Sequence, residues 1–219
     1  MTKNDKKDES MYIEYFNYTS KLISDYGEKS VVLLQCGSFF EIYGLKDFET
    51  GEISGSKIVE TARLLEFNVS HKKNVVKFND KNKQLLMAGG PDYTKDKMVN
   101  KLVEDGFTVG VYIQVSEGNS IKRVLDKVYS PGTVFSSEIE NINSLTNNTM
   151  CIWIQKHKPF KKNHIRDVLM LGASVLNVYT GQVFVFENDD LEYEIITSTF
   201  DELERFVTTY NPNEIILIY

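Results

Sequence analysis

Apolar side chains recur along the chain at two spacings, which divide it into predicted helices and strands. A spacing of three and four residues predicts a helix over Met11–Tyr26, and Gly27 follows it as the stop. A second helix is predicted over Ser56–Leu65, with its first residue as the N-cap, and a third opens at Asp92 or Thr94.

Short apolar runs and period-two alternation predict strands in the same part of the chain. These strands are Val31–Cys36, Phe39–Tyr43, Val75–Phe78, Gln84–Ala88, Thr108–Val115 and Arg123–Tyr129. The polar turn 79–82 would join the third and fourth of them into a hairpin. Helices and strands in this order are typical of the α/β (α+β) class, with a mixed sheet flanked by helices.

A polar, asparagine-rich stretch separates this region from the rest of the chain. We therefore predict a disordered tail at 1–10, a first domain at 11–135, a linker at 136–149 and a second domain at 150–219. In the second domain the pattern predicts strands at Cys151–Gln155, Val168–Tyr179 and Gln182–Glu187, a helix at Asp201–Tyr210 and a strand at Glu214–Tyr219. Because the chain ends on a fully apolar strand of the kind expected in the centre of a sheet, we interpret it as an N-terminal fragment of a longer protein.

Composition places the chain among globular proteins and narrows its compartment. Of its 219 residues, 42% are hydrophobic and 26% charged, which is enough apolar mass for packed cores. No apolar run approaches the roughly 20 residues of a membrane span, and the polar N-terminus lacks secretory or transit features. Two cysteines, Cys36 and Cys151, form no disulfide framework. We expect an intracellular, reducing compartment and no membrane partner.

Charge is distributed unevenly along the chain. The net charge is −6, yet residues 136–219 hold only six of the 25 basic side chains and 12 of the 31 acidic ones. Within the first domain, His71–Lys101 carries eight lysines against three aspartates. This stretch is either a local basic field that attracts phosphates or simply a solvated, lysine-rich hairpin.

Signatures of catalysis and of metal binding are absent from the sequence. There is no phosphate-binding loop ending in Lys-Ser/Thr, no GxGxxG, no nucleophile elbow and no HExxH. His71, His157 and His164 are isolated from partners at metal-ligand spacing. We therefore expect no catalytic residue, no metal site and no bound cofactor in this fragment, and we do not expect it to be an enzyme.

The segment 36–43, CGSFFEIY, is the most informative candidate site. In a strand, Phe40 and Ile42 point to one side, whereas Phe39, Glu41 and Tyr43 point to the other. The first pair suits a core. The second set combines a carboxylate with an aromatic, which is costly in a dry interior and indicates a wet face. Alternatively, Phe39 lies at the edge of the core while Glu41 reaches solvent.

Five blocks in order, spread over about 11–133, resemble the mismatch-recognition domain of the MutS family. They are GSFFEIYG, similar to the family's Gly-x-Phe-x-Glu motif, LLEFNVS, MAGGP, the KLV…G…VGVYIQ segment, and RV…SPGT, similar to Arg-x-Val…Thr-Pro-Gly-Thr. Leu125 and Ser130 depart mildly from the last pattern. The lead MYIEYFNY, and GSFF in place of GDFY, resemble the subfamily found in giant viruses and coral mitochondria.

This resemblance implies DNA mismatch repair, with mismatched or looped double-stranded DNA as the ligand. It implies that Phe39 enters the minor groove and stacks on the mispaired base, and that Glu41 accepts a hydrogen bond from it. Lysines of the basic stretch would contact the DNA backbone without reading sequence, and the candidates are Lys72, Lys73, Lys95 and Lys97.

The second domain resembles the first half of the MutS connector, which has a ribonuclease H-like topology. Matches include Gly181, Val183 and the Asn-Pro-x-Glu pattern at 211–214, whereas the loop Lys156–Asp167 is longer and more basic than usual. The family's lever, clamp and ATPase parts are missing, so ATP and magnesium are expected only for the full-length protein. The resemblance also implies a self-dimer, a MutL-like partner or fused nuclease, and a viral factory, virion, host nucleus or mitochondrion as the compartment.

Two alternative functions remain open. A ribonuclease H-like nuclease is one, although the first candidate strand, Cys151–Gln155, bears no acid to bind a metal. A protein-interaction module is the other, suggested by the acidic run of Asp189, Asp190, Glu192 and Glu194, which is equally typical of an exposed loop.

Overall fold

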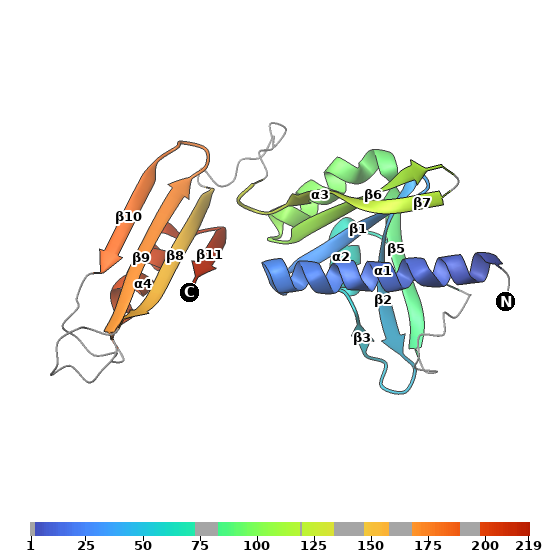
Figure 1. Cartoon of the computed structure of the whole chain (residues 1–219), viewed down its shortest axis with the longest axis horizontal. Helices are drawn as coiled ribbons and strands as arrows, with labels where there is room; N and C mark the ends of the chain where they lie inside the picture. Colours follow the sequence, from blue (N-terminus) through green and yellow to red (C-terminus); the bar gives the residue numbers. More distant parts are fainter. Residues whose placement is uncertain (1–2, 73–82, 119, 134–146, 158–167, 189–197) are drawn as a thin grey trace. The chain divides into compact units, whose positions relative to one another are not determined.

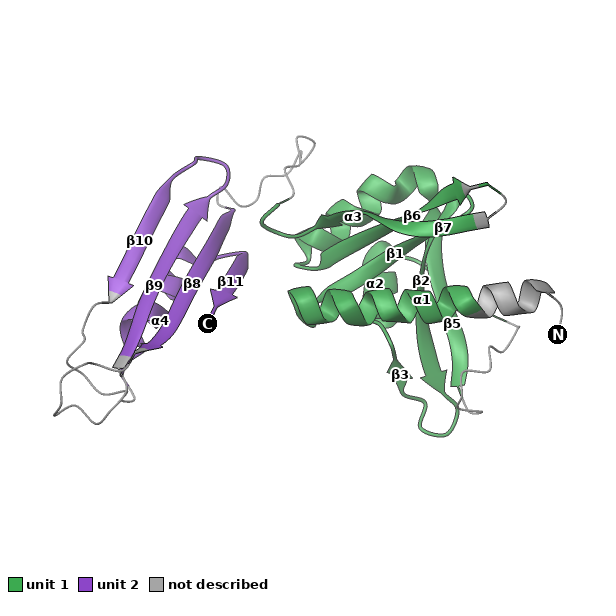
Figure 2. Ribbon diagram, in the orientation of Figure 1, with its two compact units in different colours: residues 1–135 green, residues 136–219 purple. Residues whose placement is uncertain are grey.

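A computed structural model shows two compact units, residues 1–135 and residues 136–219 (Figures 1 and 2). The structure describes residues 3–72, 83–118, 120–133, 147–157, 168–188 and 198–219. Both units combine strands with helices, which confirms the predicted mixed α/β class. The finer assignment of a linker at 136–149 and of a truncated connector stays a prediction. Among the helices of the described ranges, none is long and apolar enough to cross a bilayer.

Unit 1 is built on a mixed sheet with the strand order β4-β5-β2-β1-β6-β7, and β3 pairs with β2 outside this path. The strands are β1 (Ser30–Cys36), β2 (Phe39–Asp47), β3 (Ile53–Ser54), β4 (Ser70–His71), β5 (Lys83–Pro91), β6 (Thr108–Glu117) and β7 (Ser120–Tyr129). β1 and β6 are parallel, and every other pair of described strands in this sheet is antiparallel. The order brings β2, which carries the candidate site, between β1 and β5.

Helices cover both faces of this sheet, and alternate residues of β2 show which helix covers which face. The ring of Tyr43 contacts Tyr15 of α1 (Lys3–Tyr26), which crosses the sheet in Figure 1. The next residue, Gly44, faces Ile58 of α2 (Ile58–Leu65) on the opposite side. A third helix, α3 (Lys95–Glu104), packs against α2 and β6. The buried apolar side chains of β1 and β2 therefore lie between two layers of helix.

Two local predictions differ from the structure. α1 begins at Lys3 rather than at Met11, so the helix includes most of the predicted tail; this segment holds no Gly or Pro that would stop it. Ser56 does not cap α2, since its hydroxyl donates to the Tyr43 carbonyl and the N-cap position is Lys57.

The predicted hairpin strand 75–78 and its turn lie outside the described residues. Its predicted partner is present as β5, which pairs with β2 and with β4. The third helix opens with a short 3-10 turn, η1 (Asp92–Thr94), directly before α3.

Unit 2 is a four-stranded sheet with one described helix. The strands are β8 (Asn148–His157), β9 (Val168–Asn177), β10 (Val183–Asn188) and β11 (Glu214–Ile218), in the order β10-β9-β8-β11, and the helix is α4 (Asp201–Tyr210). Its core joins Met150, Ile152 and Val175 to Leu203 of α4. In the sheet as described β11 is an edge strand, parallel to β8, and its place in a longer protein stays a prediction.

Candidate nucleic-acid interface

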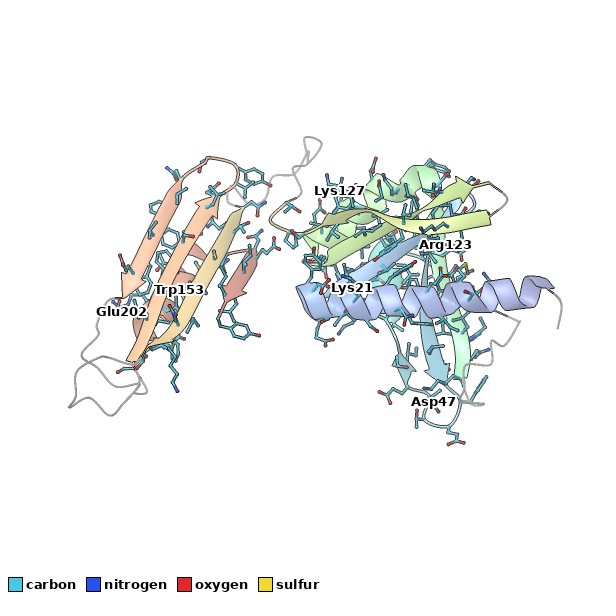
Figure 3. The ribbon with its side chains drawn as sticks, viewed as in Figure 1. Lys21, Asp47, Arg123, Lys127, Trp153 and Glu202 are labelled. Carbon is cyan, nitrogen blue, oxygen red and sulfur yellow. The ribbon has the colours of Figure 1, made fainter. Side chains whose placement is uncertain are left out.

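A tight turn at Gly37-Ser38 joins β1 to β2 and presents the candidate site at one end of the sheet. Gly37 has a φ of +62°, a left-handed conformation that favours glycine. Its backbone N–H donates to Oε1 of Gln114 at 3.1 Å, and the Gln114 N–H donates to Oε1 of Gln35 at 2.9 Å. Arg123 of β7, labelled in Figure 3, donates to the Gln35 carbonyl at 3.4 Å. These contacts attach the turn to β1, β6 and β7.

Phe39, the first residue of β2, is presented to solvent. Its side chain is 48% exposed, whereas the next residue, Phe40, is 3% exposed and belongs to the core. An aromatic ring with half of its surface in water retains apolar area that a ligand can cover. The predicted exposure of Phe39 and burial of Phe40 both agree with the structure.

The predicted wet face of β2 is exposed at only one end. Glu41 is 14% exposed, and Tyr43, predicted to share this wet face, is fully buried. The reason is α1, whose Tyr12 and Tyr15 rings meet the Tyr43 ring edge-on at centroid distances of 5.0 and 5.1 Å. Period-two alternation places side chains on a common face correctly, but it does not show how far a helix covers that face.

A hydrogen bond and an ion pair hold the carboxylate of Glu41. The Tyr43 hydroxyl donates to Oε2, and the Lys72 ammonium lies 3.8 Å from the same oxygen. Lys72 also sits over the Tyr12 and Tyr43 rings, 5.7 Å from each centroid. Because a hydroxyl carries one proton, the Cys36 thiol, 3.3 Å from the Tyr43 oxygen, is the donor in that third contact.

The pKa shifts of this cluster keep its donors protonated. Burial raises the pKa of the Tyr43 hydroxyl, and the neighbouring Cys36 and Glu41 add to the rise. Burial likewise raises the pKa of the Cys36 thiol. For Lys72, burial lowers the pKa but the Glu41 carboxylate and Tyr12 outweigh it, so the net direction is upward. Tyr43 is therefore a neutral donor and Lys72 a cation at neutral pH.

The structure describes three of the four predicted backbone-contact lysines, and their surroundings differ. The Lys72 ammonium faces Glu41, as described, so a phosphate contact would compete with that ion pair. Lys97 is exposed, and Lys95 lies 3.5 Å from Asp96 near the start of α3. Lys73 is outside the described residues.

The start of α3 lies next to the Phe39 turn. Pro91 pairs with Phe39 across β2 and β5, and the Asp92 N–H donates to the Ser38 carbonyl at 2.8 Å. Sequence reasoning missed Tyr93, which follows on η1 and is 84% exposed. Its signal in the sequence is an aromatic that belongs to no apolar periodicity, two residues after Pro91. Two exposed aromatics therefore flank one turn of the sheet.

Neither of the two alternative functions gains support from the described residues. In the part of the chain that the structure describes, no group of three or more His, Cys, Asp or Glu side chains could hold a metal ion. The acidic run at 189–194 and most of the basic loop 156–167 lie outside the described residues.

Comparison with known proteins identifies the family. The family model for MutS domain I matches residues 17–138, which is 122 of the 219 residues. A putative DNA mismatch repair protein MutS homologue of Acanthamoeba polyphaga mimivirus is 26% identical over 216 residues, 98% of this chain. MutS of Thermodesulfovibrio yellowstonii is 24% identical over 86% of the chain, and MutS of Finegoldia magna is 31% identical over 61%.

The chain spans only part of each relative. It covers 18% of the mimivirus and Thermodesulfovibrio yellowstonii proteins and 15% of the Finegoldia magna protein. The domain I match runs from α1 through β7 and contains Phe39 and Glu41, so it covers the candidate interface. Because this match extends over more than half of the residues, the chain belongs to the MutS family.

Proposed function

We propose that unit 1 recognises mismatched or unpaired bases in double-stranded DNA, with Phe39 stacking on the mispaired base and Glu41 accepting a hydrogen bond from it. One observation carries the proposal. In a chain of the MutS family, an exposed aromatic and a carboxylate lie two residues apart on one face of a strand, at a turn that is attached to three other strands.

Stacking by Phe39 explains why a mispair is preferred. A mispaired step is less well stacked than paired DNA, so opening and kinking it costs less free energy. An aromatic wedge compensates for the lost base stacking by about 1–3 kcal/mol. The Phe39 ring is suited to this because it is already 48% exposed, and little of the unit 1 core would have to open.

Glu41 contributes discrimination and little affinity. A carboxylate near phosphates is repelled, so it favours binding only where a displaced base offers a donor. In a paired duplex the Watson–Crick donors of the bases are already used within each pair. The same residue therefore attracts a mispair and disfavours a homoduplex.

The surroundings of the turn supply contacts that do not read sequence. We propose that Lys95, Lys97 and Lys73 contact backbone phosphates and that Tyr93 packs against the sugar–phosphate chain next to Phe39. Tyr93 on η1 and Lys97 on α3 are both exposed, and they follow Pro91 and Asp92, which contact the turn. In the whole protein, we propose that parts outside this chain add ATP and magnesium binding, a self-dimer and a MutL-like partner.

A titration of labelled duplexes tests the proposal. Three duplexes, identical except for a G·T mispair or one unpaired thymine, are titrated with the chain and followed by fluorescence anisotropy. A 2-aminopurine beside the mispair reports unstacking. We expect tighter binding to the two defective duplexes and a preference that falls by about 5- to 150-fold in Phe39→Ala, the range that corresponds to 1–3 kcal/mol.

Matched variants separate the two roles. Phe48 is 57% exposed just after the far end of β2, so Phe48→Ala should leave the preference intact. Glu41→Ala should lower the preference more than the overall affinity. The proposal is wrong if the chain binds all three duplexes equally, or if Phe39→Ala retains the full preference.

A further inference from the structure

The carboxylate of Glu41 accepts a hydrogen bond from a residue of its own strand. Tyr43 lies two positions further along β2, on the same face, and its hydroxyl donates to Oε2. The ring that carries this hydroxyl is fully buried and meets the Tyr12 and Tyr15 rings edge-on. The packing of the ring in the core therefore fixes the position of the hydroxyl.

A cation forms an ion pair with the same carboxylate oxygen. The Lys72 ammonium lies 3.8 Å from Oε2 and 5.7 Å from the Tyr43 ring centroid, and its side chain is 37% exposed. The Lys72 backbone N–H donates to the Leu85 carbonyl at 3.1 Å. This hydrogen bond holds Lys72 beside β5, the strand that pairs with β2. One positive charge thus lies close to the negative charge of Glu41.

The two anchors leave the other carboxylate oxygen available. Both contact Oε2, and within the described residues Oε1 of Glu41 has no donor at hydrogen-bond distance. A carboxylate can accept at both oxygens, so an occupied Oε2 does not prevent a further bond at Oε1. The Glu41 side chain remains 14% exposed, and Phe39, two residues before it on the same face, is 48% exposed.

We propose that Tyr43 and Lys72 are positioning residues for mismatch specificity: they hold Glu41 by Oε2 so that Oε1 is presented to the mispaired base. This inference rests on the proposed function. Preorganisation reduces the side-chain freedom that Glu41 loses on binding.

Removal of single groups tests the proposal. Tyr43→Phe deletes the hydroxyl and keeps the ring, and Lys72→Met deletes the charge and keeps most of the side-chain stem. We expect each to lower the preference for G·T over paired DNA by about 2- to 10-fold, the range for one hydrogen bond. The 2-aminopurine signal, which reports stacking by Phe39, should persist. Tyr112→Phe is the matched control, because its ring stacks on Tyr18 and not beside Glu41.

Double-mutant cycles distinguish positioning from a general structural effect. If Tyr43 acts through Glu41, Tyr43→Phe should lower the preference in the unmodified chain but not in the Glu41→Ala background. The same cycle, measured without DNA by urea unfolding, should show a coupling of about 2- to 10-fold in the unfolding equilibrium constant. Lys72→Met, measured in the same way, gives a second result that does not depend on Tyr43.

The outcomes separate this inference from the proposed function. Additive effects in the unfolding cycle, or an equal loss of preference in the Glu41→Ala background, would overturn the positioning roles while the Phe39 result still stands. A chain without any mismatch preference would instead overturn the proposed function, and this inference with it. Coupling in both cycles, with an unchanged Tyr112→Phe control, would support it.

Discussion

Gly89→Ala should disturb the strand pair that carries Glu41. β2 and β5 pair over nine residues, with Gly89 opposite Glu41. A Cβ at position 89 would lie 2.4 Å from the Phe40 carbonyl oxygen and 3.0 Å from Cα of Glu41, and both of these are backbone atoms. Because neither atom can rotate away, the two strands would have to separate locally.

Two opposing effects determine how Gly89→Ala changes the free energy of unfolding. Ordinary contact begins at about 3.4 Å, so relief of the closest contact requires a shift of about 1 Å, and overpacking of this kind costs about 1–3 kcal/mol. Replacing glycine by alanine in a strand recovers about 0.5–1 kcal/mol of chain entropy. With the middle of each range, we expect a net loss of about 1 kcal/mol and a displaced Glu41.

The single tryptophan makes the assay specific for one unit. Trp153 lies on β8 of unit 2, so its fluorescence follows that unit, whereas tyrosine signals and far-UV circular dichroism include unit 1 (Figure 3). In urea, Gly89→Ala should shift the circular dichroism transition and leave the Trp153 transition unchanged. The control is Gly172→Ala, whose Cβ would meet only Trp153 at 3.6 Å, an ordinary contact. Equal stability of Gly89→Ala and the unmodified chain would refute the reasoning.

Three further predictions concern contacts with the DNA backbone and the ionisation of a buried tyrosine. Lys97→Gln should weaken binding to paired and mispaired duplexes equally and reduce the slope of log K against log salt by about 0.9. A change that depends on the duplex would contradict the phosphate role of Lys97. Tyr93→Ala should weaken binding without changing that slope. Burial raises the pKa of Tyr15 to about 12, so the folded state holds this proton more tightly than the unfolded chain does. Its contribution to stability is complete below about pH 10 and is lost as the pH rises through 12, by about 2–3 kcal/mol, and Tyr15→Phe should remove that part of the alkaline loss in urea unfolding. An unchanged alkaline loss in Tyr15→Phe would show that Tyr15 does not titrate in this way.

The sequence pattern predicted most helices and strands, but it did not predict how deeply individual side chains are buried. Alternation along β2 separates Phe40 from Phe39 correctly, because it depends on local geometry alone. The burial of Tyr43 depends on where α1 crosses the sheet, which no local pattern specifies. Ser56 illustrates the same limit, since its hydroxyl bonds to the Tyr43 carbonyl of a neighbouring strand instead of capping its own helix.

The surroundings of the candidate lysines could not be predicted from their charge. The lysine-rich stretch predicts a basic field, but a count of charges does not reveal that Lys72 turns toward Glu41. That contact joins residues 31 positions apart, and it exists because β4 pairs with β5 and β5 pairs with β2. Tyr93 was missed for the opposite reason, since an exposed aromatic contributes nothing to the periodicity that reveals secondary structure.

The exposure of one strand face explains how a core strand can also serve as a recognition surface. From Tyr43 through Glu41 to Phe39, exposure rises from 0% to 14% to 48% within three alternate positions. The buried end is rigid because it shares the packing of α1, and the exposed end retains apolar surface for a ligand. Substitutions at the buried end should therefore lower the preference for a mispaired duplex, whereas substitutions at Phe39 should remove the ability to stack at all. A Tyr43→Phe chain that lost stacking, rather than discrimination, would contradict this division.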